Sequence, residues 1–288
     1  MDDYKQKLRN YYRQFKTVNP DIVAWVEAIS DRQKEIIETF DVDCISVRNY
    51  DLPFPKKQFI NNISSMYYKG RVGRRLDLLV YYSDVPLAYI QYGSPVMNRP
   101  LNKWLHHKFN DFNFKLLNEK VVDLSVCISF GNITKYLGGK LAVFVSISKE
   151  IVKLFDEKYN TNIEVVYTTS IFGKSSLYNR VRNLDYLGLS EGYHSILTKK
   201  QIEEIKRAYR IAYPHRKIKK SALAEHIIRM YDHLQNDGYK LSFEIPKTKR
   251  GVYVCDKLLP LKENLNYWYN RWFLPRRARI NREINKKC

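Results

Sequence analysis

The stretch VVDLSVCISFGNITKYLGGKLAVFVSISKEIVKLFDEKYNTNIEVVYTTS, residues 121–170, decides the fold class. Residues 121–130 and 161–170 are rich in Val and Ile and have the length of strands. Between them, apolar residues recur at helical spacing, at Leu141, Val145, Ile151, Leu154 and Phe155. A strand, a helix and a further strand in this order predict a mixed α/β core.

Further elements extend this core in both directions. Residues 76–82 and 86–93 also have the composition of strands, whereas residues 44–75, which include Pro53 and Pro55, are expected to be irregular. Helical patterns are expected at residues 4–16, 20–40, 197–210, 220–235 and 263–283. The sequence thus predicts an N-terminal helical segment (1–43), an α/β core (44–198) and a basic helical extension (199–288).

Charge is the strongest bulk signal. The chain carries 50 Lys and Arg against 30 Asp and Glu, a net charge of +20, and residues 199–288 hold 23 of those basic and 9 of those acidic residues. A concentrated basic region is typical of proteins that bind a polyanion, most often nucleic acid. Solubility alone is the alternative, but Arg clusters here as well as Lys, which favours DNA or another nucleic acid as the partner.

The sequence also argues against several protein classes. No apolar run reaches the 18 residues of a membrane span, and residues 1–16 contain no apolar signal region, so we expect a cytoplasmic protein with no membrane partner. The cysteines are too scattered for a zinc site or a disulfide framework; they are Cys44, Cys127, Cys255 and Cys288.

Residues 168–180, TTSIFGKSSLYNR, end in a polar loop that resembles half of a P-loop. Gly173-Lys174-Ser175 matches the closing part of that motif, but the glycine required five positions earlier is replaced by Thr168. A nucleotide-hydrolysing loop is therefore not expected. The hydroxyl groups of this segment either line a binding site or cap the strand and a following helix.

Two glycines precede the predicted helix in residues 129–141, SFGNITKYLGGKL. Gly138 and Gly139 stand just before its start, with Lys140 beside them. Free N–H groups, close approach and a lysine would make an anion cradle. The alternative, equally weighted, is that the glycines allow tight packing between helix and sheet.

Residues 94–109, SPVMNRPLNKWLHHKF, place polar groups just past a strand end. Asn98 there is either a binding group or part of an ordinary turn. His106 and His107 are expected to point to opposite faces of a strand, and no third ligand is nearby, so no metal site is predicted.

Residues 186–195, YLGLSEGYHS, are expected to form a turn at Gly188 and Gly192. This turn would hold Glu191 and His194 close together as a general acid–base pair. A solvated loop is the alternative, and the one that the sequence favours.

The C-terminal run YWYNRWFLPRRARIN interleaves aromatic residues with arginine, a pattern that suits base stacking and phosphate contact. Trp268 and Trp272, four residues apart, are expected to share one helix face and dock it on the core. The residues predicted to contact nucleic acid are Arg180, Arg182, Arg271, Arg276, Arg277, Arg279 and Arg282.

Several of these segments together resemble one known family. In chain order, SPVMN, VVDLSVC, LGGKLAVF, TTSIFGKSSLYNR, LGLSEGYHS, RGVYVCDKL and WYNRW resemble the Druantia anti-phage system protein A family over roughly residues 70–275. The family core looks like the acyltransferase fold of the GNAT type and is similar to phage proteins of the Mom type, which alter DNA bases. Two departures from these patterns are His194-Ser195 after Tyr193, and Lys140 where a small residue of the acyl-carrier loop belongs; the second argues against coenzyme A.

The resemblance implies a GNAT-like mixed sheet in which two strands part to form a cleft. The predicted catalytic residues of this cleft are Tyr178, Lys140, Ser176 and Asp123. The predicted substrate- or anion-binding residues are Gly138, Gly139, Thr169, Ser170, Asn98, Asn179, Glu191 and His194. Positive charge beside Tyr178 would favour its ionised form and lower its pKa, making the phenol a proton donor or acceptor; alternatively, its ring packs on the sheet.

Two functions are therefore expected. In the first, a DNA-acting protein of anti-phage defence or of a mobile element transfers a small group to a base, with an acyl carrier or another small-group donor as an unidentified cofactor. In the second, a non-catalytic subunit binds and senses nucleic acid for a helicase or nuclease partner. The sequence shows no compact Asp and Glu cluster that would favour a nuclease.

Overall fold

The computed structural model describes residues 2–70, 72–131, 134, 138–193, 196–218 and 224–285. Its contacts divide the chain into two compact units, which are described separately. The larger unit comprises Tyr12–Ser190 and Arg250–Cys288, and the smaller one Met1–Tyr11 and Glu191–Lys249. The three-part division predicted at residues 43 and 198 remains a prediction.

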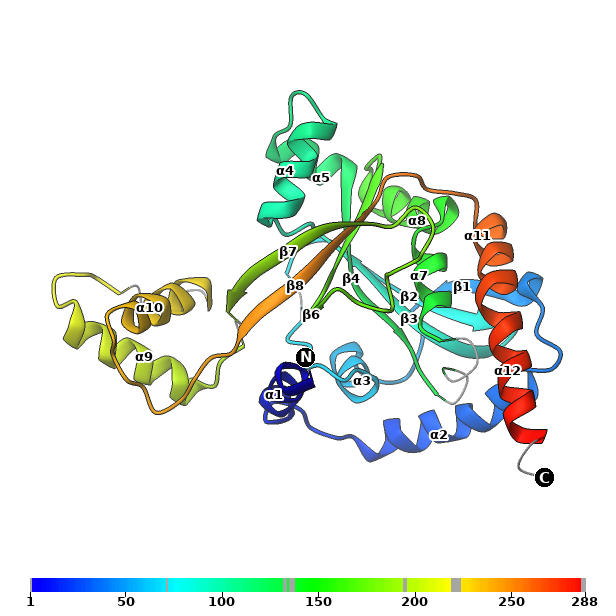
Figure 1. Ribbon diagram of the computed structural model, residues 1–288, viewed down its shortest axis with the longest axis horizontal. Coiled ribbons are helices and arrows are strands. Elements are labelled where there is room, and N and C mark those ends of the chain that lie inside the picture. Colours follow the sequence, from blue (N-terminus) through cyan, green and yellow to red (C-terminus); the bar gives the residue numbers. More distant parts are fainter. Residues whose placement is uncertain are drawn as a thin grey trace. The chain divides into compact units, whose positions relative to one another are not determined.

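An eight-stranded mixed sheet confirms the predicted α/β class (Figure 1). Its strand order is β1-β2-β3-β4-β5-β8-β6, and β7 also pairs with β8. The strands are β1 (Ile45–Asn49), β2 (Arg75–Tyr82), β3 (Val85–Gly93), β4 (Val121–Ser129), β5 (Val165–Ser170), β6 (Phe172–Gly173), β7 (Asp185–Tyr193) and β8 (Lys247–Cys255).

Strands β4 and β5 form a parallel pair that is unusually short. The pair requires a crossover, which the helices α7 (Lys140–Ser146) and α8 (Lys149–Tyr159) provide. Pairing runs only from Val121↔Val165 to Asp123↔Tyr167, although β4 continues to Ser129 and β5 to Ser170. The two strands are therefore no longer paired after Asp123 and Tyr167.

Alternating side chains of β5 and β8 enter two different cores. Val165 and Tyr167 pack on one face of the sheet with Leu101 and Leu105 of α4 (Arg99–Lys108) and with α5 (Phe114–Lys120). Val166 belongs to the larger core, to which α2 (Pro20–Glu35), α7, α8 and α11 (Leu261–Trp268) also contribute. Figure 1 shows α4 and α5 apart from α7, α8 and α11.

The structure corrects four predictions of local structure. Residues 44–75, expected to be irregular, contain a 3-10 turn (Val42–Cys44) at their start, strand β1, and α3 (Lys56–Ile63). Residues 94–109 contain the helix α4, so His106 and His107 lie in its last turn and not on a strand. The turn expected at Gly188 and Gly192 is the strand β7. Strand β8 lies within the predicted helical extension, between two of its predicted helices, where no strand was predicted.

The smaller unit has its own core, built by α9 (Lys199–Ala212) and α10 (Ala224–Asn236). Thr198 caps α9 as predicted, since its hydroxyl accepts a hydrogen bond from Gln201 N, and the Gln201 side chain bonds back to Thr198 N. Ile205, Ile227 and Leu234 are fully or almost fully buried between the helices. Most of helix α1 (Asp2–Arg13) also belongs to this unit.

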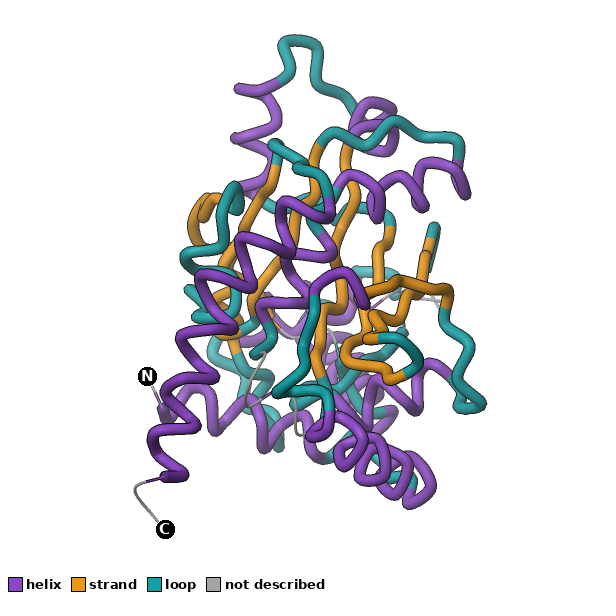
Figure 2. The backbone as a smooth tube through the Cα atoms, turned by 90° about the vertical axis from the view of Figure 1, so that its right-hand side faces the viewer, coloured by secondary structure: helices purple, strands orange, loops and turns teal. Residues whose placement is uncertain are grey.

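Residues 261–285 form one continuous helical segment with an irregular middle. Helix α11 passes into a π-helical turn (Tyr269–Phe273, η2) and then into α12 (Leu274–Asn285). Figure 2 shows this segment in purple, running in front of the orange strands to the C-terminus. Its π turn determines which aromatic side chains reach the core.

Candidate functional site

A cavity of about 760 Å³ lies where the start of α7, the loop after β6 and the helices η2 and α12 meet. We call it the arginine cavity. Its cationic lining residues are Lys140, Arg180, Arg271, Arg276, Arg279 and Arg282. Among the described residues that line it, none is a carboxylate. Arg279 also pairs with Glu283, at 3.7 Å. Six cations around one hollow, of which one has this acidic partner, create a positive potential.

Trp272, within the π turn, lines this cavity. In a π-helix the hydrogen bonds run from residue i to residue i+5, and here Phe273 packs on Trp268, with ring centroids 5.6 Å apart. Both Trp268 and Phe273 are fully buried, whereas Trp272 is only partly buried. Trp268 and Trp272 both pack against the larger core, as predicted, and Trp272 lines the cavity as well.

Three cations surround the Trp272 ring. Lys140 Nζ lies 4.6 Å from the ring centroid, and the guanidinium carbons of Arg180 and Arg271 lie 5.3 and 5.4 Å from it. Each contact is within the range of a cation–π interaction, which is worth about 0.5–2 kcal/mol. The uncharged Trp272 ring thus holds these three positive charges close together and does not neutralise them.

Two N–H donors at the arginine cavity are buried without a partner. Trp272 Nε1 and Arg276 Nε have no hydrogen-bond acceptor within the described part of the chain. Burial, together with the nearby Arg279, lowers the pKa of Arg276. An unpaired buried donor costs roughly 1–3 kcal/mol. A bound anion that accepts from both groups would offset that cost.

The two glycines serve close packing. Gly138 has φ +62°, and a Cβ there would lie 2.6 Å from Arg276 Nη1, so a glycine at this position lets the guanidinium approach the backbone. A Cβ at Gly139 would lie 2.6 Å from Leu177 Cδ1. The glycines therefore bring Arg276 and Leu177 against the loop that precedes α7.

Lys140 holds the neighbouring loop. Its ammonium donates to three carbonyl oxygens, at 2.9 Å to Ser176, 2.8 Å to Leu177 and 2.7 Å to Asn179. Burial, and secondarily Arg180, lower the pKa of Lys140 to about 8. Arg180 follows this loop with φ +61°, a left-handed conformation that costs a residue with a side chain on the order of 1 kcal/mol.

A second cavity, of about 280 Å³, fills the space between the parting strands β4 and β5. We call it the strand-gap cavity. The residues that line it are Ile60, Ser64, Met66 to Tyr68, Ser125 to Ile128, Thr169 to Phe172, Ser175, Leu177 and Tyr178. Leu177 lines both cavities, so residues 175–180 form a wall between them.

Tyr178 closes the inner end of the strand gap. Its hydroxyl lies 3.3 Å from Thr168 Oγ1, which donates to Leu124 O of β4. Burial raises the pKa of Tyr178, and Cys127 adds to the effect, so the lowered pKa expected from nearby positive charge is wrong in direction. The phenol is 6% exposed and belongs to the core. Burial likewise raises the pKa of the Cys127 thiol to about 12.

The residues expected in one cleft are thus divided between two cavities. Tyr178, Thr169 and Ser170 line the strand-gap cavity, while Lys140 and Ser176 line the arginine cavity, as do Gly138 and Gly139. Asp123 is buried at the last paired position of β4, beside Tyr178. The split follows from the wall formed by residues 175–180.

Other predicted site residues lie outside both linings. Asn98 Oδ1 accepts from Leu101 N and caps α4, and Asn179 Oδ1 accepts from Tyr253 OH at 3.3 Å. Glu191 is exposed on β7, 3.9 Å from Lys249. His194 lies outside the described residues. The acid–base pair was expected because a turn would hold Glu191 and His194 together. The structure has the strand β7 at Glu191, so this reason no longer applies.

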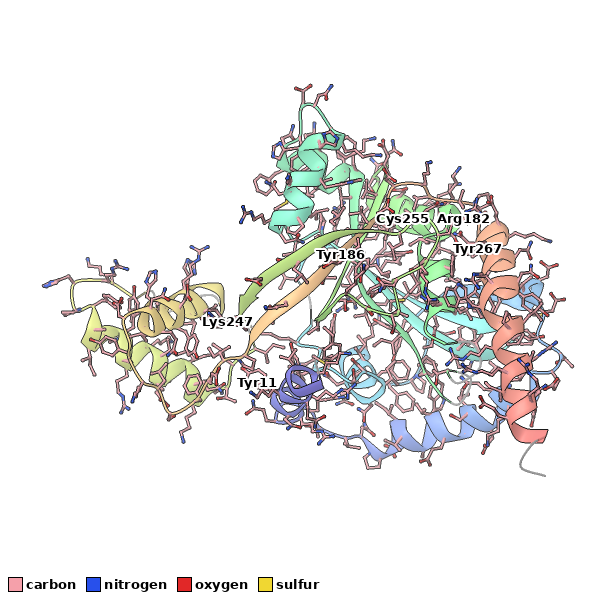
Figure 3. All side chains as sticks on the ribbon, in the orientation of Figure 1. Tyr11, Arg182, Tyr186, Lys247, Cys255 and Tyr267 are labelled. Atoms are coloured by element: carbon pink, nitrogen blue, oxygen red, sulfur yellow. The ribbon has the colours of Figure 1, made fainter. Side chains whose placement is uncertain are left out.

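Two of the arginines predicted to contact nucleic acid also lie outside the lining of the arginine cavity. Arg182 pairs with Glu263 at 2.9 Å and lies 5.6 Å from the Tyr267 ring. Figure 3 labels Arg182 and Tyr267. Arg277 donates to Glu38 O at 3.2 Å. The other five predicted arginines line the arginine cavity. The sequence reasoning missed Trp272 as a cavity residue and missed the contribution of Met66 to Tyr68.

The chain matches the family model of Druantia protein DruA over residues 3–266. It belongs to this family. Membership implies a role in anti-phage defence. Comparison with curated proteins gives no match.

Two features of other protein classes are absent from the described residues. No helix among them is both long and apolar enough to cross a bilayer. Nor do any three His, Cys, Asp or Glu side chains among them group as ligands of a metal ion.

Proposed function

We propose that this DruA-family protein acts in anti-phage defence by binding DNA, with the sugar-phosphate backbone held in the arginine cavity. The observation that carries the proposal is that Trp272 and Arg276, whose Nε1 and Nε donors are buried without a partner among the described residues, line a hollow with six cations. Phosphate oxygens accept such hydrogen bonds and supply the missing negative charge. The net charge of +20 supports a polyanion as the ligand.

The geometry supports binding better than acid–base catalysis. Lys140 Nζ already donates to three carbonyl groups, and the raised pKa of Tyr178 keeps its phenol protonated at neutral pH. A binding subunit that works with a helicase or another defence protein is consistent with both facts. Those partners are part of the proposal.

Adjacent arginines provide a matched test. Arg276→Ala should weaken binding to a fluorescent duplex about tenfold, the effect of losing roughly 1.5 kcal/mol of charge-assisted hydrogen bonding. Arg277→Ala removes the same charge one residue away, outside the cavity lining, and should change the affinity less than about threefold. Equal losses in both variants, or none in either, would reject the arginine cavity as the site.

Transfer of a small group to a DNA base is a second candidate function. The parting of β4 and β5 around a cavity favours it, because it leaves room for a substrate between two strands. Nucleoside mass spectrometry of DNA from cells that express the protein tests it. A new modified nucleoside would establish an enzyme, and unmodified DNA together with tight binding would establish the binding subunit.

A further inference from the structure

We propose that the strand-gap cavity holds a single nucleobase, unstacked from its neighbours, while the phosphate of the same nucleotide lies in the arginine cavity. This inference rests on the proposed DNA binding and names the part of the nucleic acid that the second cavity takes. It follows from the size, the polarity and the position of the cavity.

The size of the cavity limits the ligand. At about 280 Å³ it lies just below the range of roughly 300–1,000 Å³ of pockets for drug-sized molecules. It is bounded on opposite sides by the strands β4 and β5, which are no longer paired with each other beyond Asp123 and Tyr167. A gap between two strand edges suits a flat molecule better than a bulky one.

The polarity of the cavity matches a base. Ser170 is 7% exposed, lines the cavity and has no hydrogen-bond partner for its hydroxyl within the described residues. Aromatic side chains of Tyr67, Phe172 and Tyr178 also line it. Hydrogen-bonding groups at the edge of the ligand, combined with aromatic and apolar surfaces around it, are how proteins recognise a flipped base.

Hydrogen bonds to the buried Gln91 hold part of the lining in place. Tyr68 OH donates to Gln91 Oε1 at 2.8 Å, and Ser125 Oγ donates to the same oxygen at 3.1 Å. Gln91 is fully buried, and its amide nitrogen donates to Asp77 Oδ1 at 2.6 Å. These bonds fix Tyr68 and Ser125 before a ligand arrives, which lowers the entropic cost of binding.

The position of the cavity connects it to the phosphate site. Leu177 lines both cavities, and Lys140 fixes the wall between them through the carbonyls of Ser176, Leu177 and Asn179. A base and its phosphate are separated by one sugar. The sugar of the nucleotide would pass over Leu177, the residue that both linings share.

Photocross-linking with 5-iodouracil tests the inference. A short DNA with one unpaired 5-iodo-2′-deoxyuridine is irradiated with the full-length protein, and the cross-linked peptide is identified by mass spectrometry. We expect the link within residues 66–68 or 170–178. A second arm uses free 5-iodo-2′-deoxyuridine monophosphate: a link there as well would make a free nucleotide the ligand, and a link with DNA alone would make it a base of the strand.

Filling the cavity gives the matched control. Ser170→Leu should reduce the cross-link yield about tenfold. Ser190→Leu makes the same change on β7, outside the lining, and should leave the cross-link yield unchanged. If Ser170→Leu does not fold, Thr169→Leu at the neighbouring lining position replaces it.

Each remaining outcome has a distinct meaning. DNA binding without a cross-link in either arm, or with the link only outside the cavity, would overturn the nucleobase site and leave the arginine cavity intact. Loss of the cross-link in Ser190→Leu to the same extent as in Ser170→Leu would also overturn it. Failure of the wild-type protein to bind DNA would overturn the proposed function itself.

Discussion

Trp268 and Phe273, five residues apart on one continuous helical segment, stack with their ring centroids 5.6 Å apart in the buried core. Phe40 packs against both, at 5.7 Å from Trp268 and 4.8 Å from Phe273. Trp272, within the π turn between them, lines the arginine cavity. The π turn thus contributes one aromatic residue, Phe273, to the core and another, Trp272, to the arginine cavity.

The two tryptophans should therefore respond differently to truncation. Trp268→Ala removes a fully buried side chain and should lower the free energy of unfolding by about 3–5 kcal/mol. Trp272→Ala removes a partly buried side chain and its cation–π contacts, so it should lower the free energy of unfolding by about 1–3 kcal/mol and also weaken DNA binding several-fold. Denaturant unfolding and fluorescence anisotropy measure the two effects. Unchanged DNA affinity in Trp272→Ala would contradict its place in the site.

DNA affinity should fall as the pH rises from 7 to 9. Because the pKa of Lys140 is lowered to about 8, its ammonium is charged below that pH and neutral above it. The arginine cavity then loses one positive charge, and the loop loses one N–H donor to a carbonyl. In Lys140→Met this decrease should disappear. An identical pH profile in wild type and variant would show that Lys140 does not titrate in this range.

The pH dependence of stability should have the opposite sign to the pH dependence of DNA binding. A lysine whose pKa is lowered by folding binds protons more weakly in the native state than in the unfolded state. The contribution of Lys140 to the free energy of unfolding should therefore increase between about pH 8 and its ordinary pKa near 10.5. Comparing wild type with Lys140→Met by denaturant unfolding over that range isolates this contribution.

Arg180 should show a conflict between stability and function. Its left-handed backbone, at φ +61°, is strained for any residue with a Cβ, while its guanidinium lies over Trp272 in the arginine cavity. Arg180→Gly should leave the melting temperature unchanged or higher, because glycine adopts this conformation without strain. The affinity for DNA should nevertheless fall several-fold. A lower melting temperature together with full affinity would contradict this role.

Tyr178→Phe separates the two candidate functions. The variant loses only the hydroxyl beside Thr168, so a structural role predicts a loss of about 1 kcal/mol or less with defence retained. A catalytic role predicts a folded, DNA-binding protein that has lost protection against phage by about a hundredfold or more. Plaque counts and thermal unfolding distinguish these results.

Local sequence patterns predicted the central elements well. Residues 121–170 alternate between strand and helix composition, and the structure has β4, α7, α8 and β5 there. Helix α4 was missed although its signal was present, since Asn98 followed by Pro100 is a typical helix start, and the structure has Asn98 as the cap. Strand β7 was missed because Gly188 and Gly192 are typical of turns.

The site depended on features that a sequence pattern does not contain. The π turn follows from the packing of Phe273 on Phe40 and Trp268, which are brought together only by the tertiary fold. The pKa of Tyr178 could not be predicted for the same reason, since its burial comes from neighbours distant in the sequence. The arginine cluster itself was visible, although Arg277 and Arg182 proved to have protein partners.

The salt dependence of DNA binding tests the central claim most directly. If the five arginines of the arginine cavity contact phosphates, log K plotted against log salt concentration should have a slope of about −4.5, from about 0.9 released counterions for each contact. Arg276→Ala should make the slope shallower by about 1, and Arg277→Ala should leave it unchanged. A slope near zero, or one that Arg276→Ala does not alter, would contradict the account.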